Sequence, residues 1–491
     1  MLDGMTTTTE LRARIQDDLT RLGEQHGVPG AAVAFSLGTD VVEATHGVLN
    51  TRTGTAVTPD SLFQIQSITK VFTATLVMQL VDDGLVELDE PVRSFLPEFR
   101  TADEAASAKI TVRHLLTHTG GFEGDLWQPT TSGPDALDRF VRDLVSQAAQ
   151  HSAPGERWSY CNAGYGTLGR LVETTRGLPY EQALRRYLLE PLGIEEVAFS
   201  ASQALAYSTA IGHVHRTDTG PDTVSDAVSD TGPDTVSHAD ELGPSREWAL
   251  MPPSNPAAGN QLAMSARGLL ALGQLFLSHG VAPTGQQLLS ETSAAMMLRP
   301  EVPLRGVGSV PSYQSLGWAL LRPGIAEHGG GAPGVATQLA IAPDRSVAAA
   351  VVTNADVGGR LARDLLDPLF AEFADIAPAT TAPVPSPALR VADATPYTGR
   401  YATRQTESEV THDADGRLWL AEEPVREGAA MYRTAGASPT ATRNELRPIE
   451  RDTFGIIGAD GALSGTVDFV DPDRHGRFRL LAKGRVAERR S

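Results

Sequence analysis

The segment SITKVFTATLVMQLVDDG, residues 67–84, predicts both the centre of the fold and its chemistry. Apolar residues occur on every face of the helix that this segment predicts, and Gly84 ends that helix. A helix that is apolar all round is buried in the middle of a domain. Ser67 would then stand at the N-terminal end of a core helix, where the helix dipole favours developing negative charge.

Lys70 follows Ser67 by three residues, and only three of the 41 basic residues in the chain are lysines. Residues i and i+3 lie on one face of a helix, so the amine can reach the hydroxyl. A buried lysine can lose its proton and act as a base, whereas arginine stays protonated. We therefore interpret Ser67 and Lys70 as an activated nucleophile with its base. A Ser-x-x-Lys tetrad also arises by chance in a chain of this length, so the surrounding sequence has to show whether this tetrad is functional.

Length and composition exclude several classes of protein. A chain of 491 residues is expected to form two or three domains. The net charge of −19 argues against nucleic acid or an anionic membrane as a partner. The sequence has no run of about 20 apolar residues and no secretory signal at its start, so we expect a cytoplasmic protein. Cys161 is the only cysteine and the histidines show no metal spacing, so we expect neither a metal nor another cofactor.

Strand patterns lie on both sides of a run of helices. Residues 31–36 and 41–44 read as strands near the start, and residues 336–342 and 347–353 as strands much later. Amphipathic helices are predicted next to them, over residues 11–26 and 361–373. This order predicts an α/β fold in which an antiparallel sheet, flanked by helices, holds an inserted helical domain.

Three further regions divide the chain. Asp218-Thr-Gly-Pro-Asp-Thr-Val-Ser225 recurs unchanged at residues 230–237, and we interpret residues 217–243 as a disordered surface insert in a domain of residues 1–376. Residues 377–390 are rich in proline and predict a stiff linker. Residues 391–491 alternate short strand patterns with Asp-Gly turns, which predicts an antiparallel β-barrel. If this barrel lines the substrate cleft, its removal should change substrate choice more than acylation of a small ester.

Two other clusters carry chemistry. Tyr160 and Asn162 follow a Pro-Gly turn and precede a helix predicted over residues 163–175; alone, they read as an ordinary corner with a packed tyrosine. His328-Gly-Gly-Gly331 precedes the strand at 336–342, and alone it reads as a glycine-rich edge. Cys161, between Tyr160 and Asn162, is better interpreted as buried than as reactive.

Taken together, these clusters resemble the motifs of the serine β-lactamase and penicillin-binding protein superfamily. Its three motifs, Ser-x-x-Lys, Tyr-x-Asn and Lys/His-x-Gly, correspond to Ser67-Ile-Thr-Lys70, Tyr160-Cys-Asn162 and His328-Gly-Gly330. The resemblance covers residues 10 to 375 and is closest to the branch of class C β-lactamases, D-aminopeptidases and family VIII esterases. A C-terminal lipocalin-like domain also occurs in the penicillin-binding-type thioesterases of nonribosomal peptide synthesis.

The resemblance implies a role for each residue. Ser67 would attack an acyl carbon, Lys70 would take its proton, and Tyr160 would relay that proton to the leaving group. Asn162 would position Lys70 and bind the substrate amide. Backbone N–H groups of Ser67 and Gly331, beside Gly330, would form the oxyanion hole.

His328 replaces the lysine that most β-lactamases and transpeptidases carry in the third motif. Histidine is a weaker, pH-dependent cation, which favours ester, thioester or amide substrates over β-lactams. The resemblance thus implies an acyl-enzyme formed from a small-molecule or peptide substrate, with thioester-activated or carrier-protein-bound forms included. The acyl group would pass to water or to an amine, as in release or macrocyclisation of a nonribosomal peptide. A family VIII-type carboxylesterase, a D-aminopeptidase and a non-catalytic binding protein of this fold remain alternatives.

Overall fold

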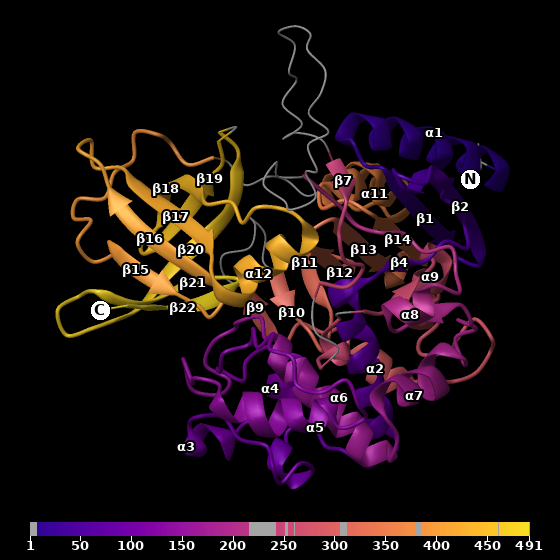
Figure 1. Ribbon diagram of the computed structural model, residues 1–491, viewed down its shortest axis with the longest axis horizontal. Coiled ribbons are helices and arrows are strands. Elements are labelled where there is room, and N and C mark those ends of the chain that lie inside the picture. The colour runs from indigo at the N-terminus through magenta and orange to yellow at the C-terminus, as the bar shows by residue number, and fades with distance from the viewer. Residues whose placement is uncertain are drawn as a thin grey trace, which may run out of the picture.

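The computed structural model describes residues 7–215, 242–250, 254–259, 261–304, 312–378, 384–459 and 461–490. Two parts lie side by side in Figure 1: a main body, from helix α1 to helix α11, and a C-terminal barrel. The repeat-containing insert predicted over residues 217–243 falls mostly outside the described residues. Its last two residues correct that boundary, because Leu242 and Gly243 form strand β7 (Leu242–Pro244), paired with β6 (His213–His215).

The main body is built on a nine-stranded antiparallel sheet with the order β3-β2-β1-β14-β13-β12-β11-β10-β9. Strand β1 pairs directly with β14, where Ala31 lies opposite Thr353, so the two ends of the main body meet in mid-sheet. The strands are β1 (Gly30–Leu37), β2 (Asp40–Asn50), β3 (Thr55–Ala56), β9 (Val302–Leu304), β10 (Ser312–Gln314), β11 (Ala319–Arg322), β12 (Ile325–Ala332), β13 (Val335–Ala342) and β14 (Val347–Thr353). The predicted antiparallel α/β fold is confirmed.

Helices cover both faces of this sheet. Helices α1 (Thr8–His26) and α11 (Gly358–Ala374) pack on one face through a cluster of aliphatic side chains with Phe35 and Phe370. Helix α9 (Ala266–Leu277) packs on the other face, against β1, β13 and β14. These helices hold the central strands rigidly, which fixes the position of β12 beside the helical region.

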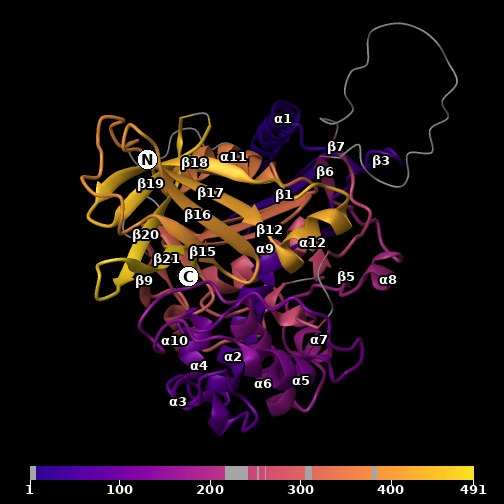
Figure 2. The ribbon, with the colours of Figure 1, turned by 60° about the vertical axis from the view of Figure 1, so that its left-hand side comes forward.

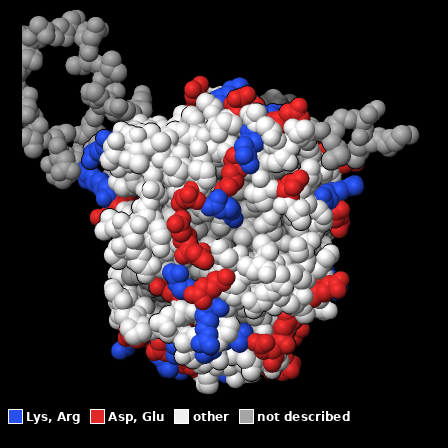
Figure 3. Space-filling view, turned by 90° about the vertical axis from the view of Figure 1, so that its right-hand side faces the viewer, with Lys and Arg blue, Asp and Glu red and all other residues white. Residues whose placement is uncertain are grey.

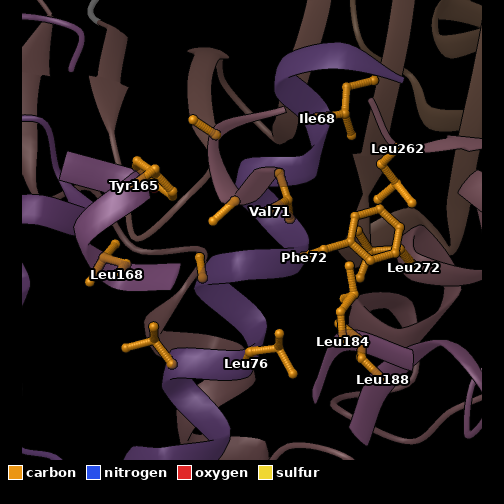
Figure 4. Packing of buried hydrophobic residues seen from close by; sticks show 14 of the residues in the cluster. Ile68, Val71, Phe72, Leu76, Tyr165, Leu168, Leu184, Leu188, Leu262 and Leu272 are labelled. Atoms are coloured by element: carbon orange, nitrogen blue, oxygen red, sulfur yellow. The ribbon is translucent and has the colours of Figure 1, made fainter. Parts of the chain in front are cut away.

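Helix α2 (Thr69–Asp82) occupies the core between the sheet and the helical region, as the all-round apolar pattern predicts. Every residue from Thr69 to Leu80 is buried. Figure 4 shows its side chains Val71, Phe72 and Leu76 among residues from several other elements, which are Tyr165, Leu168, Leu184, Leu188, Leu262 and Leu272. Burying a side chain such as Phe72 contributes about 1.5–3 kcal/mol, so α2 is a stable base for the residues at its start.

The helical region fills the middle of the chain and lies below the sheet in Figure 1. Its helices are α3 (Glu104–Ser107), α4 (Val112–Leu116), α5 (Ala136–Arg139), α6 (Asn162–Arg176), α7 (Tyr180–Leu184), α8 (Ala201–Ala204) and α10 (Glu291–Met296). A small sheet joins this region to the main sheet through β4 (Phe63–Gln64), β5 (Val197–Ala198) and β8 (Ala263–Met264).

The C-terminal strands close into the antiparallel barrel that the sequence predicts, and Figure 2 shows it lying across the helical region and the sheet. Its core contains packed aromatic rings, among them Tyr397, Phe454 and Phe469. Its elements are β15 (Gly399–Ala402), β16 (Thr406–His412), β17 (Leu418–Pro424), α12 (Arg426–Ala435), β18 (Thr442–Glu450), β19 (Thr453–Ile457), β20 (Leu463–Pro472), β21 (Phe478–Lys483) and β22 (Arg485–Arg489).

The surface of the main body carries mixed charge. On the face in Figure 3, acidic and basic side chains alternate across a broad uncharged surface, with no continuous basic patch. None of the described helices is both long enough and apolar enough to span a lipid bilayer.

Candidate active site

Ser67 lies in the single-turn helix η1 (Gln66–Ile68), immediately before α2. It is partly exposed, whereas the residues on both sides of it are buried. Gln66 adopts φ 47°, in the left-handed region that residues other than glycine rarely occupy. Such a conformation costs about 1–3 kcal/mol and persists only where the surrounding structure enforces it. The hydroxyl of Ser67 is therefore held on a strained turn at the N-terminal end of the buried helix α2.

The amine of Lys70 is fully buried and reaches the serine. Its Nζ lies 3.2 Å from Ser67 Oγ and 2.5 Å from the carbonyl oxygen of Ala258. Burial lowers the pKa of Lys70 well below its usual value; the Arg485 guanidinium lowers it further, and the Asp125 carboxylate opposes both. A neutral amine that donates to Ala258 keeps a lone pair for the hydroxyl proton. The pair can therefore activate Ser67 as a nucleophile.

Tyr160 stands on the other side of the amine, in the loop before α6. Lys70 Nζ lies 4.7 Å from the centroid of the Tyr160 ring. Burial raises the pKa of the phenol to about 12, although hydrogen bonding with Ser67 lowers it. Tyr160 is therefore a neutral phenol that interacts with the same hydroxyl as Lys70, and it can pass on a proton.

His118, which the sequence analysis did not single out, supports this tyrosine. Its ring lies 4.4 Å from that of Tyr160, and its Nδ1 accepts the backbone N–H of Cys161. His118 also has a left-handed backbone, with φ 58°. Burial lowers the pKa of His118 well below its usual value, so the ring is neutral. It packs against Tyr160 and accepts one hydrogen bond. Cys161 is buried as expected; its Sγ accepts the N–H of Gly164, and burial raises its pKa to about 12.

Asn162 has a different partner from the one expected. Its Nδ2 donates to Asp125 Oδ1 at 2.6 Å. Within the described part of the chain, Lys70 Nζ lies within hydrogen-bonding distance of Ser67 Oγ and the Ala258 carbonyl oxygen, and no hydrogen bond joins it to Asn162. The amide is drawn to Asp125 because a buried carboxylate forms a stronger, charge-assisted hydrogen bond than a neutral group does.

His328 and the glycines after it lie on β12, beside η1. The ring Nδ1 is 2.7 Å from the carbonyl oxygen of Gly329. Burial, aided by Lys70, lowers the pKa of His328 to about 4. The charge of His328 depends on pH, as expected of a histidine, and burial keeps the imidazole neutral at pH 7.

Gly330 and Gly331 differ in their surroundings. A Cβ on Gly330 would lie 2.3 Å from the carbonyl oxygen of Ile65 and 2.4 Å from Thr337 Oγ1. Glycine at this position therefore lets β12 pass against the segment that leads to Ser67. A Cβ on Gly331 would meet nothing within 4 Å. Gly331 faces open space, where an acyl group could approach the strand.

Three contributors to the site come from positions without a recognisable local pattern. Asp125 lies in the loop after α4, and Gly259 follows the short helix η7 (Pro256–Ala258), whose last residue binds Lys70. Arg485 comes from the barrel, with its guanidinium carbon 5.1 Å from the centroid of the Tyr160 ring. No sequence pattern marks Asp125, because its burial is known only from the folded structure.

Comparison with known proteins agrees with this geometry. The Beta-lactamase family model matches residues 15–370, which contain all three motifs. The chain belongs to this family. Penicillin-binding protein 4 of Amycolatopsis lactamdurans is 35% identical over 400 residues, which cover 79% of this chain and 97% of that protein. Esterase EstB of Burkholderia gladioli is 28% identical over 263 residues, covering 51% of this chain and 65% of its own.

Solved structures match the barrel as well. The crystal structure of SurE covers 98% of this chain and 100% of its own, with a TM-score of 0.72 and 26% identity. Membership of the Beta-lactamase family makes this protein a serine hydrolase of the β-lactamase-like type, in a group that includes penicillin-binding proteins and esterases.

Proposed function

We propose that this enzyme forms an acyl-Ser67 intermediate from an ester, thioester or amide of a peptide-like substrate. The observation that carries the proposal is the placement of one hydroxyl, Ser67, within reach of a neutral amine, Lys70, and a neutral phenol, Tyr160. A base with a depressed pKa and an acid with a high one are the two groups that acyl transfer requires around its nucleophile.

In acylation, the lone pair of Lys70 takes the proton of Ser67 as Oγ bonds to the acyl carbon. Tyr160 delivers a proton to the leaving group, and its phenol is restored from Lys70. The oxyanion that forms would lie between the backbone N–H groups of Ser67 and Gly331, and each donor of this kind contributes about 2.7–4 kcal/mol. In deacylation, the same proton transfers occur in the reverse order: Tyr160 and Lys70 take a proton from the incoming nucleophile, and Ser67 Oγ regains its proton as it leaves the acyl carbon.

The acyl group then passes to an amine or to water, and we favour an amine of the same peptide, giving a released macrocycle. The similarity to SurE supports a substrate that contains a D-residue, because it extends over the barrel and one structure of SurE contains D-Leu. The neutral His328 argues against a β-lactam as the acyl donor, since the third motif then offers no cation to hold the β-lactam carboxylate. A carrier-protein-bound peptide thioester ending in a D-residue is the proposed donor.

The first experiment tests the nucleophile. Treatment with a fluorophosphonate, followed by intact mass and peptide mapping, should give one adduct at Ser67. Ser67→Ala should abolish the adduct, and Cys161→Ala serves as the matched control because that thiol is buried beside Tyr160. Absence of any adduct would support the binding-protein alternative.

The second experiment tests the acceptor. N-acetylcysteamine thioesters of a peptide with a free N-terminal amine, ending in either D- or L-leucine, are incubated with the enzyme and resolved by mass. We expect the cyclic peptide from the D-substrate in excess over the linear acid. Linear acid alone from both substrates would instead support a plain esterase or peptidase.

A further inference from the structure

The turn between β21 and β22 enters the main body at the second motif. The carbonyl oxygen of Gly484 accepts the backbone N–H of Tyr160 at 3.0 Å, and the N–H of Val486 donates to Ser159 Oγ at 3.1 Å. These bonds anchor the loop of Tyr160 to the barrel on both sides of Arg485. The barrel is therefore in direct contact with the residue proposed to carry the proton.

Asp125 joins the two parts of the molecule at the same place. Its side chain is 2% exposed, and its Oδ2 forms an ion pair with Nε of Arg485, whose side chain is 39% exposed. Its Oδ1 accepts from Asn162 Nδ2 at 2.6 Å and from Arg485 Nη2 at 3.3 Å. The backbone oxygen of Asp125 also accepts from Gln405 Nε2, in the barrel, at 2.7 Å.

We propose that Asp125 is a positioning residue for acyl transfer, holding Asn162 of the main body and Arg485 of the barrel on one buried carboxylate. A buried carboxylate is stable only when its oxygens are hydrogen-bonded and its charge is paired. Asp125 meets this requirement only when the barrel is docked. The barrel thereby becomes part of the catalytic centre and not only a wall of the substrate cleft. The inference rests on the proposed function, in which Lys70 is the base.

The charges around Lys70 make this role measurable. The titratable and charged groups that face it are His118, Asp125, Tyr160, Cys161, Tyr165, His328 and Arg485. Burial keeps the two histidines, the two tyrosines and the thiol neutral near pH 7. Among the groups named, only the Asp125 carboxylate and the Arg485 guanidinium remain charged, and they act on the amine in opposite directions.

The test compares Asp125→Asn and Arg485→Gln by the pH dependence of acylation. Stopped-flow release of p-nitrophenol gives the rate, and the burst amplitude gives the fraction of competent enzyme. Each variant should acylate roughly tenfold to a hundredfold more slowly at pH 7, as expected for displaced catalytic groups. The acidic limb of the pH–rate profile reports the pKa of Lys70. It should move to lower pH in Asp125→Asn, because Lys70 loses a negative neighbour, and to higher pH in Arg485→Gln, because Lys70 loses a positive one.

Glu488→Ala is the matched control. Glu488 lies three residues beyond Arg485 on β22 and contacts His151 of the main body at 2.8 Å, and it is not among the groups that shift the pKa of Lys70. Glu488→Ala should have the wild-type acylation rate at pH 7 and an acidic limb of the pH–rate profile at the wild-type position. In the double variant Asp125→Asn/Arg485→Gln, the limb should return toward its wild-type position.

Three outcomes would overturn the inference: acidic limbs unmoved in both single variants, limbs that move in the same direction, or a lower burst amplitude with an unchanged rate. The last would mean that Asp125 stabilises the fold only. These outcomes differ from failure of the proposed function, in which wild-type enzyme itself gives no burst. Arg485→Lys keeps the charge but loses the forked geometry of the guanidinium. If the inference holds, this variant should acylate faster than Arg485→Gln and more slowly than wild type.

Discussion

Gly259 offers a direct test of how closely the site is packed around the nucleophile. It ends η7 with φ 112°, directly after the residue whose carbonyl binds Lys70. A Cβ at this position would lie 2.1 Å from the carbonyl oxygen of Gln66 and 2.9 Å from Cα of Ser67. Gly259→Ala should therefore displace either the turn that carries Ser67 or the carbonyl that orients Lys70.

The size of the effect follows from these distances. Carbon and oxygen atoms in close contact stay about 3.3 Å apart, so the backbone must open by roughly 1 Å. A displacement of this size at a catalytic group lowers the rate by about a hundredfold, or about 2.7 kcal/mol. The left-handed backbone adds about 1–3 kcal/mol of destabilisation to the folded state.

Gly177→Ala is the matched control, since Gly177 also has a left-handed backbone, with φ 66°, but its added Cβ meets nothing within 4 Å. Thermal unfolding should show a loss of stability in both variants. Acylation of p-nitrophenyl acetate, corrected by burst amplitude, should be slow only in Gly259→Ala. Acylation by that variant within about twofold of wild type, or an equal loss in Gly177→Ala, would refute the reasoning.

Three further predictions follow from the buried groups. Lys70→Arg should lower acylation by about 10²–10⁴-fold, because a guanidinium cannot accept the proton, and near-normal turnover would contradict the role of base. Relative to Lys70→Met, wild type should gain up to about 1.4 kcal/mol of stability per pH unit in urea titrations as the pH rises from the folded-state pKa of Lys70 toward 10.5. The sign follows because the unfolded chain keeps a proton on Lys70 up to about its usual pKa of 10.5, whereas the folded chain releases it at lower pH; parallel curves would exclude a depressed pKa. Phe469→Ala should destabilise the barrel by about 3–5 kcal/mol, since its ring is 2% exposed and packs against Tyr397 and Phe454; a loss below about 1 kcal/mol would show a looser core.

The sequence predicts those parts of the site that depend on local periodicity. Helix α2 is recognisable because every face of it is apolar, and that pattern also places Ser67 at its start. The strands β1, β13 and β14 follow from short apolar runs between turn residues. The three motifs are visible because their spacing within each segment is short.

What remained hidden depends on contacts between distant residues. Asp125 and Arg485 are 360 positions apart, and no pattern along the chain connects them. The sequence marks His328 as a pH-dependent cation, but the pH at which it becomes charged depends on its burial, which only the folded structure defines. Asn162 likewise has Asp125 as its partner because the loop between α4 and α5 passes the start of α6 in the folded structure.

The left-handed backbones at Gln66 and His118 have a consequence for protein engineering. Glycine would relieve the backbone strain at either position, about 1–3 kcal/mol, but it would also remove a buried side chain. Gln66 donates to Gln64, and the His118 ring packs on Tyr160, so the loss of either side chain costs about as much as the strain or more. A screen for heat resistance should therefore leave both residues in place, and the strain at the two positions stays with the active enzyme.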